Sequence, residues 1–115
     1  ILNDVTTILS HIKNMGISEE LDFIKKISDN KGTASDYLDI MEAWYRDILV
    51  YKSTGETDML MFLNESIYIS QAADSEEYAN ISHIIDMIET TRDRINANVN
   101  VSVCFELLLD TMKEG

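Results

Sequence analysis

Apolar residues recur every three or four positions along most of the chain, which is the period of an α-helix with one buried face. The pattern is clear over residues 3–16, 18–32, 33–55, 74–99 and 100–115. The positions predicted to share the inward faces are Val5, Ile8, Leu9, Ile12, Met15, Leu21, Ile24, Ile27, Leu38, Met41, Trp44 or Tyr45, Ile48, Leu49, Tyr78, Ile81, Ile85, Ile88, Arg92, Ile95, Val103, Leu107 and Leu108. Together these segments predict an all-α fold, an antiparallel bundle of five to six helices with short polar connections.

The stretch from Thr57 to Ala73 is harder to interpret. Its first half, "TDMLMFLNES", has the character of a short helix, whereas "IYIS" alternates weakly like a strand. Four β-prone residues in a helical chain are usually overruled by packing. We therefore expect helical turns here, with an irregular piece near Asn64 to Ile69.

Three asparagines, Asn96, Asn98 and Asn100, alternate with small apolar residues between the last two predicted helices. Asparagine tolerates the left-handed backbone region better than other non-glycine residues, and its amide can cap loose backbone groups. The sequence predicts that Asn98 stops one helix and Asn100 caps the next, with Val99 packed inward. Such a helix corner needs neither Gly nor Pro.

Composition supports this picture and narrows the possible partners. The chain has no proline and four glycines, and its formal charge is 9 − 21 = −12. A surface this negative repels phosphate backbones, so direct nucleic-acid binding is disfavoured. One cysteine, Cys104, fits a reducing cytoplasm, and no apolar run approaches the length of a membrane span. The chain opens "ILND" without an initiator Met, which favours a piece cut from a longer protein.

Few residues suggest chemistry, and we expect no catalytic residue, metal site, nucleotide site or cofactor. His11 and His83 lack partners at metal-ligand spacing, and the isolated glycines form no phosphate loop. Cys104 stands among apolar residues, which predicts burial and inertness. Two alternatives stay open: His83 as a phosphoacceptor on an exposed helix face, and a small-ligand pocket lined by Met41, Met59, Met61 and aromatic residues.

The stretch "AWYRDILVYK" is the richest in side chains that favour protein contacts, because aromatic residues and Arg are enriched at interface hot spots. The residues that we assign to a possible subunit interface are Trp44, Tyr45, Arg46, Leu49, Tyr51 and Lys52. The alternative for Trp44 is a place in the core, and one helix can serve both purposes with adjacent faces.

Two runs, "WYRDILVYKSTG" and "INANVNVSVCFELLLDTM", resemble the C-terminal region of the delta-prime subunits of the bacterial DNA polymerase III clamp loader. The positions that match the first run are Arg46, Asp47, Ile48, Leu49 and Lys52. Those that match the second are Asn98, Asn100, Glu106, Leu107, Leu108 and Leu109. The tau/gamma subunits carry a related domain with a similar helix.

The resemblance implies that residues 1–115 form a single helical collar domain that assembles subunits and is not itself catalytic. The implied partners are the tau/gamma and delta subunits, bound through their own collar domains. The ATPase-like module of such subunits would lie before Ile1. A stiff, acidic and helical domain without catalytic motifs suits docking to proteins better than binding DNA.

Overall fold

The computed structural model describes residues 1–27 and 30–114, and within these it contains helices and no strand. The six α-helices are α1 (Leu2–Ser10), α2 (Ile17–Ile27), α3 (Lys31–Thr54), α4 (Ser66–Ser75), α5 (Tyr78–Asn96) and α6 (Val101–Glu114). Two short 3₁₀ turns, η1 (Ile12–Asn14) and η2 (Leu63–Glu65), follow α1 and precede α4. The predicted all-α bundle of five to six helices is confirmed.

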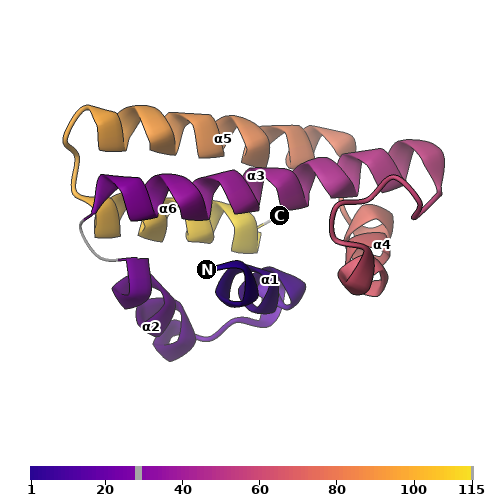
Figure 1. Cartoon of the computed structure of the whole chain (residues 1–115), viewed down its shortest axis with the longest axis horizontal. Helices are drawn as coiled ribbons and strands as arrows, with labels where there is room; N and C mark the ends of the chain where they lie inside the picture. The colour runs from indigo at the N-terminus through magenta and orange to yellow at the C-terminus, as the bar shows by residue number, and fades with distance from the viewer. Residues whose placement is uncertain (28–29, 115) are drawn as a thin grey trace.

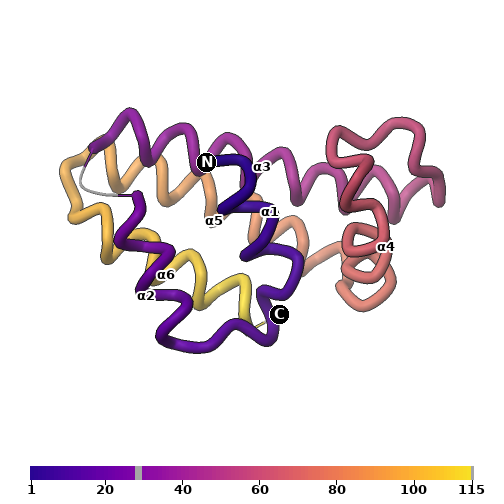
Figure 2. The backbone as a smooth tube through the Cα atoms, turned by 60° about the horizontal axis from the view of Figure 1, so that its bottom comes forward, coloured from indigo at the N-terminus to yellow at the C-terminus, as the bar shows by residue number. Residues whose placement is uncertain are grey.

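The 24-residue helix α3 is the axis of the molecule (Figure 1). Helix α5 runs antiparallel beside it and α6 turns back along α5, whereas the shorter helices α1, α2 and α4 lie at steep angles to α3 and α5 (Figures 1 and 2). The result measures 39 × 25 × 23 Å. Helix α4 and the loop before it cover the C-terminal end of α3, while α1 and α2 cover its N-terminal half and α6.

One continuous core joins all six helices. The largest fully buried side chains are Trp44, Phe105, Ile27, Leu38, Met41, Ile48, Ile69, Ile81, Ile84, Ile88, Leu108 and Leu109. Trp44 and Met41 lie near the middle of α3, which packs against α1, α2, α4 and α5. Each such side chain contributes roughly 1.5–3 kcal/mol by leaving water.

The predicted inward faces of α2, α5 and α6 are each wrong in part. Leu21 is exposed and Phe23 is buried instead, edge-on to Tyr37 with ring centroids 5.5 Å apart. In α5, Ile84 and Thr91 are buried, whereas Ile85 is only half-buried and Tyr78 is exposed. Where apolar residues are adjacent, helical periodicity alone leaves the rotation of the helix open by one position.

Helix α6 shows the largest rotation from its predicted face. Val103 and Leu107 are exposed, while Cys104, Phe105 and Leu109 join Leu108 in the core. The reason is that α6 packs against both α5 and α2, so its buried surface is wider than one stripe. Two apolar residues remain on its outer side at an i, i+4 spacing.

The irregular piece between α3 and α4 lies earlier than predicted. Gly55 ends α3 in the left-handed region, with φ of 71°, and its N–H donates to the Tyr51 carbonyl. Residues 56–62 then form turns, and helix resumes through η2 and α4. The "TDMLMFLNES" stretch is therefore largely loop, whereas "IYIS" is helical, with Ile69 buried.

The asparagine corner is confirmed at Asn98 and Asn100. Asn98 has φ of 67°, and the Val99 N–H donates to the Arg94 carbonyl at 2.9 Å, which closes α5 as a Schellman motif. The Asn100 Oδ1 accepts from the Val103 N–H at 3.1 Å and caps α6. Val99, predicted to pack inward, is exposed because the left-handed residue turns the chain outward there.

Candidate functional site

A buried carboxylate on α3 organises the loop that follows this helix. Asp47 is only 3% exposed, and its two oxygens accept the backbone N–H groups of Met61 at 3.1 Å and Phe62 at 2.8 Å. A buried carboxylate is tolerated only when it is hydrogen-bonded, and two backbone donors meet that need here. Asp47 therefore fixes the backbone of a loop that lacks regular secondary structure.

Aromatic packing fixes the same loop from its other side. The Phe62 ring is buried against Trp44, with ring centroids 5.4 Å apart. The neighbours of Phe62 point the other way, because Met61 is 75% and Leu63 is 55% exposed. The loop is thus held by its backbone and by one ring, and it presents two large apolar side chains to solvent.

These side chains border a groove of about 580 Å³ between the loop, α3 and the start of α1. Its lining consists of Leu2, Asn3, Thr6, Asp39, Ile40, Ala43, Met61, Phe62, Leu63, Asn64 and Glu65. We call this set the apolar groove. Ile67, on the first turn of α4, is also exposed, whereas Tyr68 lines a different cavity.

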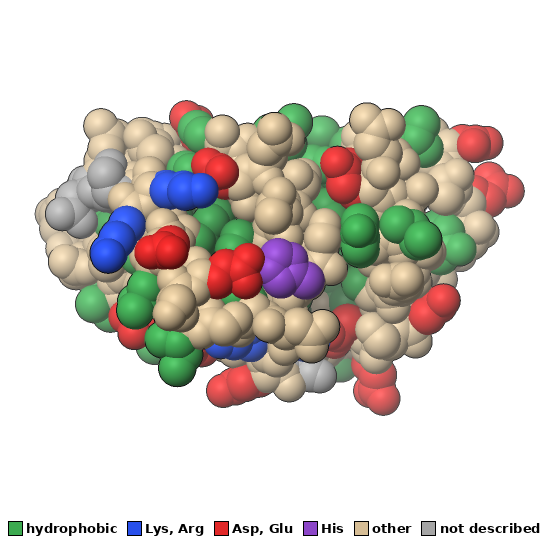
Figure 3. Space-filling view, turned by 90° about the horizontal axis from the view of Figure 1, so that it is seen from below, with side chains coloured by type: hydrophobic (Ala, Val, Ile, Leu, Met, Phe, Trp, Pro, Cys, Tyr) green, Lys and Arg blue, Asp and Glu red, His purple; other side chains and the backbone are tan. Residues whose placement is uncertain are grey.

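The surroundings of the apolar groove are acidic. Its lining includes Asp39 and Glu65 but no Lys, Arg or His. Asp39 is 2.8 Å from an Arg92 guanidinium nitrogen, whereas no cation in the described part of the chain lies within ion-pair distance of Glu65. In the view of Figure 3, acidic side chains lie across the whole face, hydrophobic side chains cluster over α4 and its preceding loop, and the visible Lys and Arg lie toward the other end.

The sequence supports the same segregation of charge. Residues 53–91 contain no Lys or Arg. Their acidic residues are Glu56, Asp58, Glu65, Asp74, Glu76, Glu77, Asp86 and Glu89. The segment that carries the exposed apolar side chains of the loop and of α4 is therefore acidic. Cations of other segments offset part of this charge, since Lys13 pairs with Glu76, Arg92 pairs with Glu89 and Lys52 lies at the end of α4.

The predicted interface residues divide between the core and the surface. Trp44 and Tyr45 are buried, so they support α3 from within and offer almost no surface to a partner. Arg46 is exposed and pairs with Glu42 at 2.8 Å, the i, i+4 neighbour. The Lys52 Nζ donates to the Ala73 carbonyl at 2.8 Å and lies 5.0 Å from the Tyr78 ring centroid, so it ties α3 to the end of α4.

Leu49 and Tyr51 are half-buried and pack against the core. The stretch from Trp44 to Lys52 thus builds the platform beneath the loop and α4. An interface formed directly by these six side chains stays a prediction.

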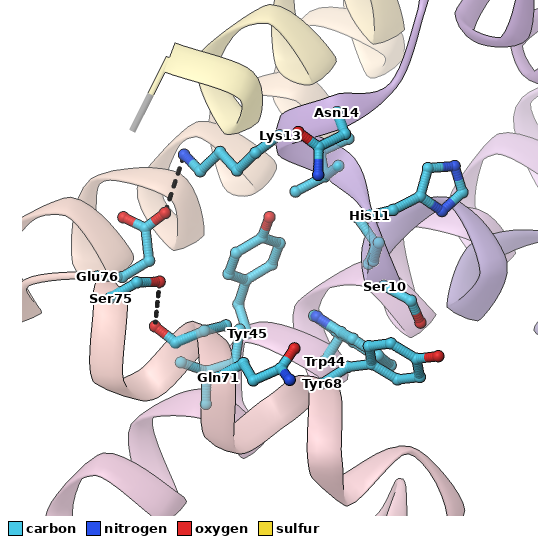
Figure 4. A pocket seen from close by; sticks show the side chains of 14 residues that line it. Ser10, His11, Lys13, Asn14, Trp44, Tyr45, Tyr68, Gln71, Ser75 and Glu76 are labelled. Carbon is cyan, nitrogen blue, oxygen red and sulfur yellow. Dashed lines mark hydrogen bonds and ion pairs between the residues drawn. The ribbon is translucent and has the colours of Figure 1, made fainter.

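A second cavity, of about 170 Å³, lies between η1, α3 and α4 (Figure 4). The Tyr45 hydroxyl points into it, and burial together with the Glu76 carboxylate raises the pKa of Tyr45, so this phenol stays neutral. Lys13 Nζ lies 2.8 Å from Glu76 and donates to the Met112 carbonyl at 2.8 Å. Lys13 and Glu76 thus pair with each other across the cavity, and these polar contacts join η1, the end of α4 and the end of α6.

The predicted small-ligand pocket does not form as proposed. Met41 is fully buried in the core, whereas Met59 and Met61 are exposed on the loop. Met61 borders the apolar groove, which Met41 and Met59 do not line. The aromatic-lined cavity of Figure 4 contains no methionine.

The remaining chemical candidates are isolated from one another. His83 is exposed on α5, as predicted, and its i±3 and i±4 neighbours are Ala79, Asn80, Asp86 and Met87, none of them a cation. Burial raises the pKa of the Cys104 thiol, which is 1% exposed, so the predicted burial is confirmed. In residues 1–27 and 30–114, no three His, Cys, Asp or Glu side chains gather in a way that could hold a metal ion.

Comparison of the sequence with models of protein families gives no match, and comparisons with curated proteins and with solved structures give none either. Within the described part of the chain, every helix is too short or too polar to cross a membrane. Among the described residues, the apolar groove combines a concave surface with large exposed apolar side chains, and we take it as the candidate functional site.

Proposed function

We propose that this chain is the helical collar domain of a bacterial clamp-loader subunit of the delta-prime type, and that it acts by assembling subunits without catalysing a reaction itself. The observation that carries the proposal is the run from Trp44 to Lys52. These residues resemble the delta-prime family, and they form the part of α3 that supports the loop and the apolar groove.

Three further features support a role in assembly. The chain displays exposed apolar side chains on an anchored loop, which is typical of a surface that another protein covers. Its net charge of −12 disfavours direct contact with DNA. The long helices α3 and α5, together with the capped corner that joins α5 to α6, give a stiff body that can transmit force between neighbouring subunits.

The nearest alternative within this class is the equivalent domain of a tau/gamma subunit, which carries a similar Arg-Asp-aliphatic helix. The "VYKSTG" extension and the Asn-x-Asn corner favour the delta-prime type. We place the protein in the cytoplasm on the same proposal, since clamp loading takes place on the chromosome.

The test is reconstitution. The chain is mixed with purified tau/gamma and delta subunits, and the masses of the species are measured by size-exclusion chromatography with light scattering. We expect a heteromeric complex that contains this chain, and no such complex with an unrelated acidic helical protein of similar size. Failure to form any heteromer with either subunit would overturn the proposal.

A further inference from the structure

We infer that the apolar groove receives an amphipathic helix of a neighbouring subunit, one whose aliphatic face is flanked by Lys or Arg. This inference rests on the proposed function and names the surface and the chemistry through which it is carried out. It starts from the loop that Asp47 and Trp44 hold in place.

The loop holds two large apolar side chains in solvent because its backbone is fixed from within. Met61 and Leu63 flank the buried Phe62, and the Met61 and Phe62 amides are tied to the Asp47 carboxylate. These contacts hold the loop by two amides and one ring, so the adjacent side chains are held out in a defined arrangement. Preorganised apolar side chains bind a partner with less loss of conformational entropy than a flexible loop would.

The shape of the groove suits a helix of the partner. The groove is open, and one wall is the loop while the other is formed by Leu2 and Thr6 of α1, with Ile40 and Ala43 of α3 at its base. The half-buried Ile40 and Ala43 pack against the core and give the base an apolar character. Helix-in-groove recognition uses such a surface, with partner side chains at i, i+3, i+4 and i+7 as anchors.

The carboxylates at the rim of the groove favour a partner that carries positive charge. Glu65 and Asp39 border the groove. Asp39 is already paired with Arg92, so Glu65 is the carboxylate that a partner's cation would meet, and the segment that contains the loop and α4 has no Lys or Arg. A Lys or Arg beside the partner's aliphatic face would find the Glu65 carboxylate, which has no ion-pair partner among the described residues. A second copy of this chain is a poor occupant, because two bodies of net charge −12 repel each other.

The inference is tested by paired substitutions in the 115-residue chain. Leu63→Asp places a charge in the groove, and Leu107→Asp makes the same change at a leucine of similar exposure on α6, 47% against 55%. Glu65→Lys reverses a charge at the rim of the apolar groove. Its control is Glu106→Lys, which makes the same change at an exposed position of α6. Circular dichroism and thermal melting of all four variants establish that the fold is retained.

Binding to the tau/gamma and delta subunits is measured by surface plasmon resonance at two salt concentrations. We expect Leu63→Asp to weaken binding by about tenfold or more, because it desolvates a charge in an apolar contact, while Leu107→Asp changes Kd less than about threefold. Glu65→Lys should weaken binding and reduce its salt dependence, in contrast to Glu106→Lys.

The outcomes separate the inference from the proposal beneath it. If the unaltered chain binds neither subunit, the proposed function fails. If it binds and the groove variants bind as well as their α6 controls, the function stands and the groove is not the site. Dimerisation of the chain alone that Leu63→Asp abolishes would assign the groove to a second copy and contradict the inference.

Discussion

Replacement of Asp47 by alanine tests whether one buried carboxylate holds the loop that forms the apolar groove. The change removes the acceptor for two backbone N–H groups, those of Met61 at 3.1 Å and Phe62 at 2.8 Å. A hydrogen bond to a charged group contributes roughly 1.5–3 kcal/mol, so the two together represent about 3–6 kcal/mol. The Met61 amide is only partly buried and water can reach it, which lowers the expected loss to about 2–4 kcal/mol.

The measurement is urea unfolding followed by the fluorescence of Trp44, the only tryptophan, whose ring packs against Phe62. Amide hydrogen exchange adds a local readout, and the Phe62 amide should exchange much faster in Asp47→Ala. Arg46→Ala is the matched control on the same helix turn, because the Arg46 side chain is exposed and its i, i+4 pair with Glu42 contributes only about 0.3–0.5 kcal/mol.

The reasoning would be refuted if Asp47→Ala lost less than about 0.5 kcal/mol, within the range of an ordinary surface substitution. It would also be refuted if the Phe62 amide exchanged at an unchanged rate. Asp47→Asn provides an intermediate case, because its amide keeps one oxygen acceptor and presents a donor to the second N–H. We expect Asp47→Asn to lower the free energy of unfolding by about half as much as Asp47→Ala does.

Three further predictions concern the corner, the thiol and a buried acid. Asn98→Ala together with Asn100→Ala should cost about 1–3 kcal/mol in urea unfolding, through lost capping and left-handed strain, whereas Asn98→Gly should be nearly neutral since glycine accepts that φ. A loss of similar size for Asn98→Gly and Asn98→Ala would contradict this. Cys104 should react with a thiol reagent only when urea unfolds the chain, and rapid labelling of the native protein would oppose its burial. Burial raises the pKa of Glu20 from its ordinary value of 4.5, and Lys113 partly opposes this. The folded state therefore binds the proton more tightly than the unfolded state, and stability falls as the pH rises through the raised pKa of the folded state. The free energy of unfolding of Glu20→Gln minus that of the parent chain should therefore be larger at pH 7 than at pH 4. An equal difference at both pH values would argue against the burial effect.

Much of the fold could be predicted from local patterns. Stripes of apolar residues identified the helices, and the chemistry of asparagine identified the corner at Asn98 and Asn100. The errors arose where the outcome depends on neighbours in space. Leu21 and Phe23 compete for the inward side of α2, and only the position of Tyr37 decides between them.

The candidate functional surface was harder to predict from the sequence. The aromatic stretch at Trp44 and Tyr45 was predicted to form a subunit interface, with the core as the alternative for Trp44; both rings lie in the core, and Trp44 packs against Phe62 of the loop. The loop itself was expected to be helical, because Met59, Met61 and Leu63 are apolar and close together. One signal was present: Asp47 interrupts the buried stripe between Trp44 and Ile48, and a buried acid requires a partner.

The central claim is that this chain functions by protein contact through its anchored loop. The six methionines allow a direct test by methyl NMR of the selectively labelled chain mixed with unlabelled tau/gamma and delta subunits. Met61 borders the groove and Met59 is exposed on the same loop, whereas Met15 and Met112 are buried and serve as internal references. We predict that the Met61 methyl resonance shifts or broadens most, while the methyl resonances of Met15 and Met112 keep their chemical shifts. Binding that leaves Met61 and Met59 unchanged, or no binding at all, would contradict the account.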